Sequence, residues 1–522
     1  MRLVNINWIL YSLLALTAVK GIIWAGIIPA WQAPDEQNHF SLIQFYAESK
    51  KLAVDPKYDN TVSEELLQTT DLMNVDWSGK HPMWRPEFSN TSVGLYEEKI
   101  SQIAKEDCQT FLFMGNGRKS PPFYYLLGGI VYLIFSPFDI LVRLFALRFL
   151  SVAIGVGTVF FTYLFVKEIY PARQWLALAS ATLVSFQSSF NFVTSTVNVD
   201  SMVIFLTTVF VYVGIKYLKA KDEKLKDIFW LMIVSVLGVL IKATLLPLVV
   251  VLFITIGARK IKEQKITRQN IEIAILFISL ITLYLISSVS FGFLTDIASF
   301  FAQARGVVFF TSLLNFAKSA IPHYNGQVFG WYWAVFGWLE VSLPVNFYRV
   351  LKILTVFAFF GLGVVTYRKL RTRNFNNLGV ILFIFGTLLF LHGATFFFDW
   401  QTFVRTGNLF GFQGRHFLSP IGIHMFLLTI GLTVFFKSYQ QKLTLFLLIV
   451  LFIFLNIFSI YQISHYFYPS KNLLELYFFV SQYKPVFLKA PFLLAYSFIF
   501  IILLGLFLYQ IFVNFLGNWE NK

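Results

Sequence analysis

Charged residues are scarce in this sequence: Asp, Glu, Lys and Arg together make up only 13% of its 522 residues. A soluble domain carries about 25%, and a chain that is 57% hydrophobic cannot cover a globular surface with what remains. The soluble-enzyme, disordered and fibrous classes are therefore excluded. With 62 Phe and a mean hydropathy of +0.67, the composition predicts an all-α polytopic membrane protein.

Cysteine is nearly absent as well. A single residue, Cys108, excludes an intramolecular disulfide framework, a CxxC redox site and a cysteine-cluster metal site. Acidic residues are also outnumbered, 27 against 42 basic ones. In a membrane protein an excess of Lys and Arg marks cytoplasmic loops, so no nucleic-acid partner is expected. The chain lacks phosphate-loop, zinc-protease and serine-hydrolase signatures, and these chemistries have no support.

The few acidic residues gather in one stretch. Residues 30–119 hold 14 of the 27 acidic residues and 9 of the 42 basic ones. This stretch follows an apolar span, Trp8–Pro29, which we interpret as a retained helix. Basic clusters recur between the later apolar runs, and placing all of them in the cytoplasm puts both termini inside. About twelve spans result: roughly 8–29, 140–166, 175–193, 201–217, 228–241, 243–257, 271–290, 350–366, 378–397, 418–436, 443–462 and 491–514.

This threading divides the chain into five parts: a first transmembrane helix (1–29), a first extracytoplasmic loop with an interfacial helix (30–139), transmembrane helices (140–290), a second extracytoplasmic loop (291–347) and C-terminal transmembrane helices (348–522). The interfacial helix is expected from Pro121 to Phe135. A hairpin of two short helices is expected to turn at Lys242-Ala243-Thr244, below the outer surface. Lys20, in the middle of the first span, requires a partner or a water-filled cavity.

An acidic pair, Asp35-Glu36, stands just beyond the first span, after Pro34. Proline followed by acids is also an ordinary helix start, because carboxylates there complement the helix dipole. A helix from Pro34 would place Asp35 and His39 on one face. A carboxylate pair beside an imidazole at the membrane edge suits a general base, or a divalent cation such as Mg, Mn or Ca held by Asp35 and Glu36.

Further polar residues are expected on the same outer side. Each has an ordinary alternative: Asp200 as a turn residue, Glu340 as part of an interfacial belt, and the arginines as snorkelling side chains. Cations would nevertheless suit an anionic lipid headgroup, because guanidinium binds phosphate through two hydrogen bonds. The candidate substrate-binding residues are His39, Asp200, Lys242, Glu340, Arg405, Arg415 and His416.

The whole chain resembles the GT-C superfamily of membrane glycosyltransferases, which take sugars from polyprenyl-phosphate carriers. The matching features are Asp35-Glu36 after the first span, the Pro-Pro-x-Tyr-Tyr helix from Pro121, and Asn198-x-Asp200 before a span. Within that group it is most similar to the bacterial domain-of-unknown-function 2142 family of multi-pass membrane proteins. The motifs shared with that family are Pro34 to Phe40, Gly337 to Pro344 and Gly414 to Pro420, with His416 in place of Tyr and Glu340 in place of Asp.

The resemblance implies a glycosyltransferase, inverting in mechanism, that transfers sugar from a polyprenyl-phosphate donor to a glycan, lipid or protein acceptor outside a bacterial plasma membrane. Asp35 would be the base, Glu36 its metal-binding or positioning partner, and Arg415 the main phosphate ligand, with Lys242 and Arg405 assisting. Two alternatives stay open. A transporter or flippase of lipid-linked saccharides would use the same cationic cavity, and a non-catalytic scaffold for envelope assembly would not need the acidic pair.

Overall fold

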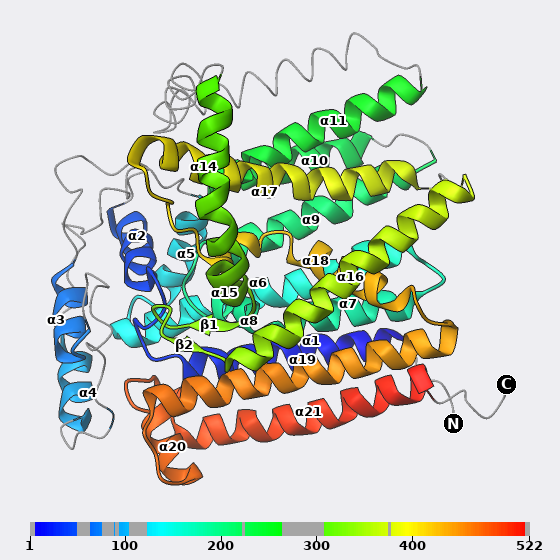
Figure 1. The fold of residues 1–522 in the computed structure, drawn as a ribbon. Coiled ribbons are helices and arrows are strands. Elements are labelled where there is room, and N and C mark those ends of the chain that lie inside the picture. Colours follow the sequence, from blue (N-terminus) through cyan, green and yellow to red (C-terminus); the bar gives the residue numbers. More distant parts are fainter. Residues whose placement is uncertain are drawn as a thin grey trace.

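The computed structural model describes residues 6–49, 63–75, 88, 93–103, 123–221, 225–263, 307–373 and 377–516, which are helical apart from one small hairpin of strands (Figure 1). Eight helices in this part of the chain are long and apolar enough to cross a membrane. They are α1 (Ile6–Ile27), α6 (Ile140–Ile169), α9 (Asp200–Lys219), α11 (Leu246–Glu263), α16 (Val345–Arg371), α17 (Leu378–Thr406), α19 (Ser438–Phe467) and α21 (Ala490–Leu516).

A ninth candidate span is bent. Helices α7 (Gln174–Phe186) and α8 (Ser188–Thr194) meet at an angle of 65° and together pass the same test. Two further predicted spans are shorter helices, α10 (Leu225–Ile241) and α18 (Ile421–Thr433). The predicted span 271–290 lies outside the described residues. The polytopic helical class is confirmed, while the number of about twelve spans stays a prediction.

The remaining elements lie between the spans. The expected turn at Lys242 is confirmed, since the 3₁₀ turn η3 (Ala243–Leu245) separates α10 from α11. The interfacial segment forms α5 (Phe123–Ile134); its Pro121 and Pro122 lie outside the described residues. The other elements are α2 (Glu36–Ser49), α3 (Glu64–Leu72), α4 (Val93–Gln102), α14 (Val307–His323), the π-turn η4 (Tyr324–Val328), α15 (Phe329–Ala334), β1 (Val335–Phe336), β2 (Val341–Ser342), η5 (Gly414–Phe417), α20 (Leu473–Val480) and η6 (Val486–Leu488).

The polar connections between the helices differ in charge at the two ends of the bundle. The turns that follow α6, α9 and α16 lie together at one end of the bundle, where α1 begins and α21 ends (Figure 1). Basic residues gather there, including Lys167, Lys219 and Arg368 in the last turns of their helices. Cations at helix C-termini also complement the helix dipole. The opposite end carries α2 to α5 and the β hairpin (Figure 1).

Helices α1, α6, α7 and α9 form the buried centre, whereas α16 and α21 present most of their apolar side chains outward, as lipid-facing helices do. Helix α16 crosses α18 at glycines. A Cβ on Gly361 would lie 1.8 Å from the carbonyl oxygen of Gly431, so the two backbones touch directly. Small residues permit this close approach between helices in a bilayer.

The bend between α7 and α8 supplies the partner of Lys20. The Nζ of this fully buried lysine donates to the backbone carbonyl of Ser185 and, at 3.1 Å, to its Oγ. It also lies over the ring of Phe186, 3.9 Å from the centroid. A broken helix leaves carbonyl groups without intrahelical partners, and these groups need donors inside a membrane. Lys20, on the neighbouring helix α1, therefore supplies a hydrogen-bond donor to a backbone carbonyl group at the bend.

Candidate functional site

Asp35 occupies the turn between α1 and α2. Its backbone is left-handed, with φ of 65°, and α2 begins one residue later, so Asp35 is the residue before the helix. Its backbone carbonyl accepts from the N–H of His39. The carboxylate is 39% exposed and accepts a hydrogen bond of 2.7 Å from Arg415. Burial alone would raise the pKa of Asp35, but Arg415 and then His39 outweigh it and hold that pKa below its usual value.

Glu36 has a different environment from its neighbour. Its carboxylate is fully buried and forms two hydrogen bonds with Arg148, of 2.5 and 2.8 Å. It also accepts from the backbone N–H groups of Trp31 and Val197. Arg148 in turn donates to three backbone carbonyls at the end of α1, those of Ala25, Ile28 and Pro29. Glu36 therefore fastens the turn that presents Asp35, and the two carboxylates do not share one cation site in this arrangement.

Arg415 reaches Asp35 from η5. A Cβ on Gly414 would lie 2.0 Å from the backbone nitrogen of Tyr332, so only glycine allows η5 to rest on α15. Arg415 donates to the carboxylate of Asp35 and to the carbonyl of Pro34, at 3.3 Å. Its Nε is buried and has no partner in the described part of the chain. The guanidinium therefore keeps one N–H donor that no described group uses.

A second ion pair lies beside the first. Asp200, the first residue of α9, accepts a hydrogen bond of 2.6 Å from the Nζ of Lys242 at the turn between α10 and η3. The side chain of Asn198 accepts from the backbone N–H of Asp200 and fixes this helix start. The side chain of Lys242 is 27% exposed, so it is not fully covered by the protein.

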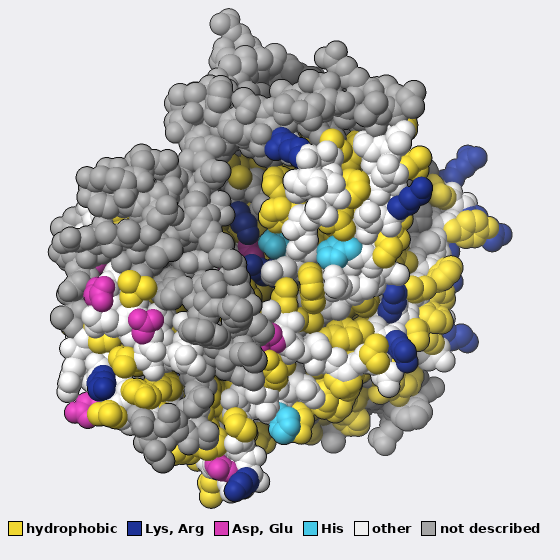
Figure 2. Space-filling view, turned by 60° about the vertical axis from the view of Figure 1, so that its left-hand side comes forward, with side chains coloured by type: hydrophobic (Ala, Val, Ile, Leu, Met, Phe, Trp, Pro, Cys, Tyr) yellow, Lys and Arg dark blue, Asp and Glu magenta, His cyan; other side chains and the backbone are white. Residues whose placement is uncertain are grey.

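Six of the predicted residues come together in one cluster. Figure 2 shows a recess in which basic, acidic and histidine side chains meet beside an apolar surface. The six act on one another electrostatically: Asp35, His39, Asp200, Lys242, Arg415 and His416. Burial lowers the pKa of His39 to about 4 and that of His416 to about 3, so both are neutral at pH 7. Two carboxylates then balance two cations.

Two predicted residues have other positions. Glu340 lies in the hairpin of β1 and β2, whose tight turn has Gly337 and Leu339 in left-handed conformations. Its carboxylate accepts a hydrogen bond of 2.6 Å from Tyr466 of α19, which ties the hairpin to that helix. Arg405 is exposed in the last turn of α17. Neither residue contacts the six-residue cluster within the described part of the chain.

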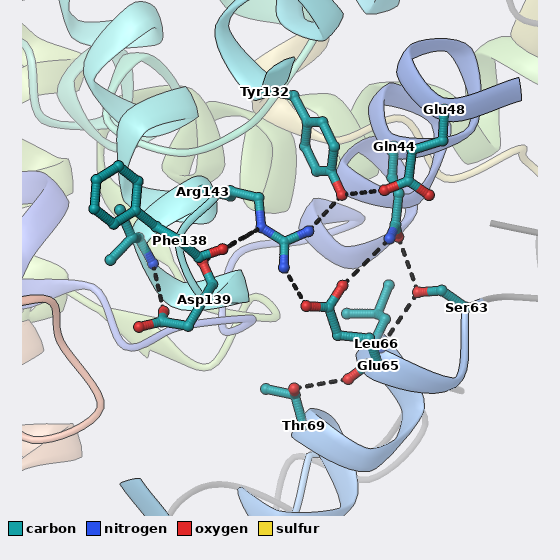
Figure 3. A network of polar contacts seen from close by, with 11 residues as sticks. Gln44, Glu48, Ser63, Glu65, Leu66, Thr69, Tyr132, Phe138, Asp139 and Arg143 are labelled. Atoms are coloured by element: carbon teal, nitrogen blue, oxygen red, sulfur yellow. Dashed lines mark hydrogen bonds and ion pairs between the residues drawn. The ribbon is translucent and has the colours of Figure 1, made fainter. Parts of the chain in front are cut away.

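Sequence reasoning missed two buried arginines of α6. Arg148 holds Glu36, and Arg143 is the centre of a second network in which it donates to Glu65 of α3 and to the hydroxyl of Tyr132 of α5 (Figure 3). Tyr132 donates to Glu48 of α2 at 2.6 Å. This network joins α2, α3, α5 and α6. An arginine inside an apolar span requires a buried partner, and that signal could have identified both residues.

An apolar groove adjoins the cluster. A cavity of about 690 Å³ runs between α15, α16, α17 and α18, and Phe417, two residues after Arg415, is part of its wall. A smaller cavity of about 200 Å³ continues it towards Lys369 and Asn377 at the other end of the bundle. The two cavities share four lining residues, Leu362, Thr366, Phe385 and Leu427. The groove therefore follows α17 for about 27 Å between residues 378 and 396, at about 1.5 Å per residue, close to the thickness of a bilayer core.

The site can bind an anion and accept a proton, with an apolar chain alongside. As to metals, the described residues contain no group of three or more His, Cys, Asp or Glu side chains placed to hold an ion. Of the predicted acidic pair, only Asp35 faces the cluster, because all oxygen lone pairs of Glu36 are used by Arg148 and two backbone amides.

Comparison with curated protein sequences finds no match. Among solved structures, the oligosaccharyltransferase of Archaeoglobus fulgidus, in a complex with Zn and sulfate, is 15% identical, with 87% of this chain and 53% of that chain covered and a TM-score of 0.43. The enzyme AglB from the same organism, in complex with an inhibitory peptide and a dolichol-phosphate, is 14% identical, with coverage of 87% and 56% and a TM-score of 0.44. This chain thus spans about half the length of these archaeal enzymes.

ArnT from Cupriavidus metallidurans, bound to undecaprenyl phosphate, is 11% identical, with 96% of this chain and 74% of that chain covered and a TM-score of 0.41. A family model gives the assignment, because it matches residues 19–423, more than three quarters of the sequence. The chain belongs to the family described as predicted membrane protein (DUF2142), as the motifs had indicated.

Proposed function

We propose that the protein is a membrane glycosyltransferase that moves a sugar from a polyprenyl-phosphate donor to an extracytoplasmic hydroxyl acceptor. The observation that supports this proposal is that a cationic site, a carboxylate and an apolar groove lie next to one another. Arg415 and Lys242 form a cationic site beside the exposed carboxylate of Asp35, and the apolar groove begins two residues from Arg415. A lipid-linked phosphate needs both surfaces, because its headgroup is anionic and its tail is apolar.

In this mechanism the hydroxyl oxygen of the acceptor attacks the anomeric carbon of the sugar. The bond between that carbon and the phosphate oxygen breaks, and the proton of the hydroxyl passes to the carboxylate of Asp35. The departing phosphate keeps the bonding electrons and gains one negative charge. Arg415 and Lys242 stabilise that charge, since they are positioned before the reaction. Attack from the face opposite the phosphate inverts the anomeric centre.

The ion pair of Asp35 with Arg415 fits this sequence of events. Without a donor, Arg415 lowers the basicity of Asp35. A donor phosphate bound to Arg415, whose Nε has no partner among the described residues, would compete with the carboxylate for the guanidinium. Donor binding thereby makes Asp35 a stronger base when the sugar is in place. Asp200 holds Lys242 towards the same phosphate.

Transfer from a synthetic polyprenyl-phosphate sugar, with purified protein in nanodiscs, tests the proposal. Arg415→Lys should raise the KM for the donor, because a single ammonium cannot reproduce two hydrogen bonds in one plane. Arg405→Lys is the matched control, since Arg405 lies outside the cluster and its substitution should leave the donor KM unchanged. Equal donor KM values for Arg415→Lys and the wild type would remove the phosphate role of Arg415.

The flippase alternative has a distinct result. A flippase would move the lipid-linked saccharide across a vesicle membrane without forming a new glycosidic bond. Transport by the wild type, lost in Lys242→Gln and accompanied by no transfer to any acceptor, would replace the transferase proposal with this one. A scaffold would show neither transfer nor transport.

A further inference from the structure

Two histidines meet on the wall of the apolar groove. The Nε2 atoms of His392 in α17 and His424 in α18 are 3.0 Å apart, and their rings are nearly parallel, with an interplanar angle of 15°. The Nδ1 of His424 is 2.9 Å from the hydroxyl of Tyr332 in α15. All three side chains line the cavity of about 690 Å³. They form a hydrogen-bonded chain in a wall that is otherwise mostly apolar.

The histidine pair is not part of a packed interface between its two helices. Helix α17 packs mainly against α11 and α9, whereas α18 packs mainly against α16 and α7. The imidazoles therefore reach across the groove that separates α17 from α18. Polar groups in an apolar environment are unfavourable unless they are hydrogen-bonded, and ionisable residues at membrane depth commonly serve a function.

The hydrogen-bonded chain of Tyr332, His424 and His392 ends in a nitrogen without a partner. A neutral imidazole donates through one nitrogen and accepts through the other. Tyr332 can donate to Nδ1 of His424, and Nε2–H of His424 can then donate to Nε2 of His392. In that arrangement the Nδ1 of His392 carries a proton. This nitrogen has no hydrogen-bond partner among the described residues, and His392 is only half-buried. The hydrogen-bonded chain thus ends in one unused donor, on a residue that lines the groove.

We propose that Tyr332, His424 and His392 form a hydrogen-bonding site for a phosphate oxygen of the lipid carrier, on the lipid side of the cation cluster. This inference rests on the proposed function, and it adds a specificity site that neither the cluster nor the apolar wall explains. The ring of His392 packs against Phe417, with centroids 5.3 Å apart. Phe417 follows Arg415 by two residues, so the histidine chain adjoins the position where the phosphate meets its tail.

The direction of the chain suits an anion. Each donor in the series polarises the next, and a negative charge at the end favours the arrangement in which all three groups donate towards it. A hydrogen bond to a charged group is stronger than one to a neutral group. The site should therefore distinguish a polyprenyl phosphate from the corresponding polyprenol, whose tail is the same and whose hydroxyl is uncharged.

Lipid binding without any sugar transfer tests this inference. Native mass spectrometry of the purified protein in nanodiscs can compare a polyprenyl monophosphate with the polyprenol of equal length. We expect the wild type to prefer the phosphate, and His392→Phe to reduce that preference about tenfold. Tyr332→Phe, which keeps both imidazoles, should reduce it less, because the hydroxyl acts through His424. His465→Phe in α19, where the ring stacks on Tyr461, is the matched control and should leave the preference unchanged.

Four results would overturn the inference. An unchanged preference in either His392→Phe or Tyr332→Phe would show that the hydrogen-bonded chain only links α15, α17 and α18. An equal loss of phosphate and polyprenol binding would show that His392 is merely part of the wall. If the wild-type protein does not prefer the polyprenyl monophosphate over the polyprenol, both this site and the proposed polyprenyl-phosphate donor are excluded. A preference that depends on Arg415 but survives His392→Phe would leave the proposed function standing and exclude only this site.

Discussion

Asp35 and Glu36 are neighbours in the sequence, yet their carboxylates meet different surroundings. Asp35 is partly exposed beside Arg415, whereas Glu36 is fully buried with Arg148. Asp35→Asn should therefore lower transfer by roughly 10²–10⁴, the usual contribution of a general base, while the protein keeps its melting temperature. Transfer from a polyprenyl-phosphate donor is the measurement. Wild-type rates in this variant would exclude Asp35 as the base.

Glu36→Gln should instead lower the stability of the protein. Removing one member of a buried ion pair leaves the other charge uncompensated, which costs about 3–5 kcal/mol of folding free energy. The apparent melting temperature in detergent should fall well below that of Asp35→Asn, which serves as the neighbouring control. A Glu36→Gln protein that melts like the wild type but transfers no sugar would instead give Glu36 a direct role in the reaction.

The two histidines of the cluster make stability depend on pH. In the folded protein their pKa values are lowered to about 4 for His39 and about 3 for His416, against about 6.5 in an unfolded chain. The unfolded state therefore binds more protons between these limits. Stability is complete above about pH 6.5 and decreases as the pH falls towards 4. Melting temperatures at about pH 7.5 and about pH 5 should differ less in a His39→Gln, His416→Gln double variant than in the wild type; equal differences would contradict this account.

At the residue scale, the sequence predicted six residues that the structure brings together, but not the buried residues that support them. Asp35, Asp200, Lys242 and Arg415 stand next to ends of apolar spans, and the ends of neighbouring spans on one side of a bilayer lie close together. The partner of Glu36 could not be found in the same way, because Arg148 is 112 positions away inside a span. A sequence also does not show how far apart two residues lie within the plane of the membrane. The pattern predicts Glu340 on the same side as the cluster, but its carboxylate accepts a hydrogen bond from Tyr466 instead.

At the scale of elements, the short turn η5 depends on one glycine. A Cβ on Gly414 would lie 2.0 Å from the backbone nitrogen of Tyr332, which is not a side-chain atom that can move aside. Gly414→Ala should displace η5, separate Arg415 from Asp35 and reduce donor binding. Gly505→Ala is the control, since a Cβ there meets nothing within 4 Å. Normal donor binding by Gly414→Ala would show that Arg415 does not need this contact.

The bent and interrupted helices show where local patterns are insufficient. The apolar run 175–193 reads as one span, but Gln187 ends α7 and caps α8, and its side chain donates to the carbonyl of Tyr332 at 2.5 Å. That contact comes from α15, almost 150 residues later, so no local signal specifies the bend. The turn at Lys242, by contrast, was predictable because two basic clusters bracket an apolar segment of limited length.

At the scale of the whole molecule, the helix directions place the basic turns after α6, α9 and α16 at one end of the described bundle, as the distribution of charge in the sequence predicted (Figure 1). The side of the membrane to which that end belongs follows from the positive-inside rule and can be measured. Cysteine labelling in intact cells needs a background without Cys108, the single native cysteine. Lys221 is exposed in the turn after α9, and Lys471 is exposed between α19 and α20, at the opposite end.

In a Cys108→Ser background, Lys471→Cys should react with a membrane-impermeant maleimide in intact cells, whereas Lys221→Cys should react only after permeabilisation. The reason is that positively charged turns stay on the cytoplasmic side during insertion, so the end that carries Asp35 and Arg415 is expected to face outward. Both variants replace an exposed lysine, and each therefore serves as the reactivity control for the other once the cells are permeabilised. Labelling of Lys221→Cys without permeabilisation would show that the protein has the opposite orientation in the membrane. The cluster would then face the cytoplasm, where an extracytoplasmic acceptor could not reach it.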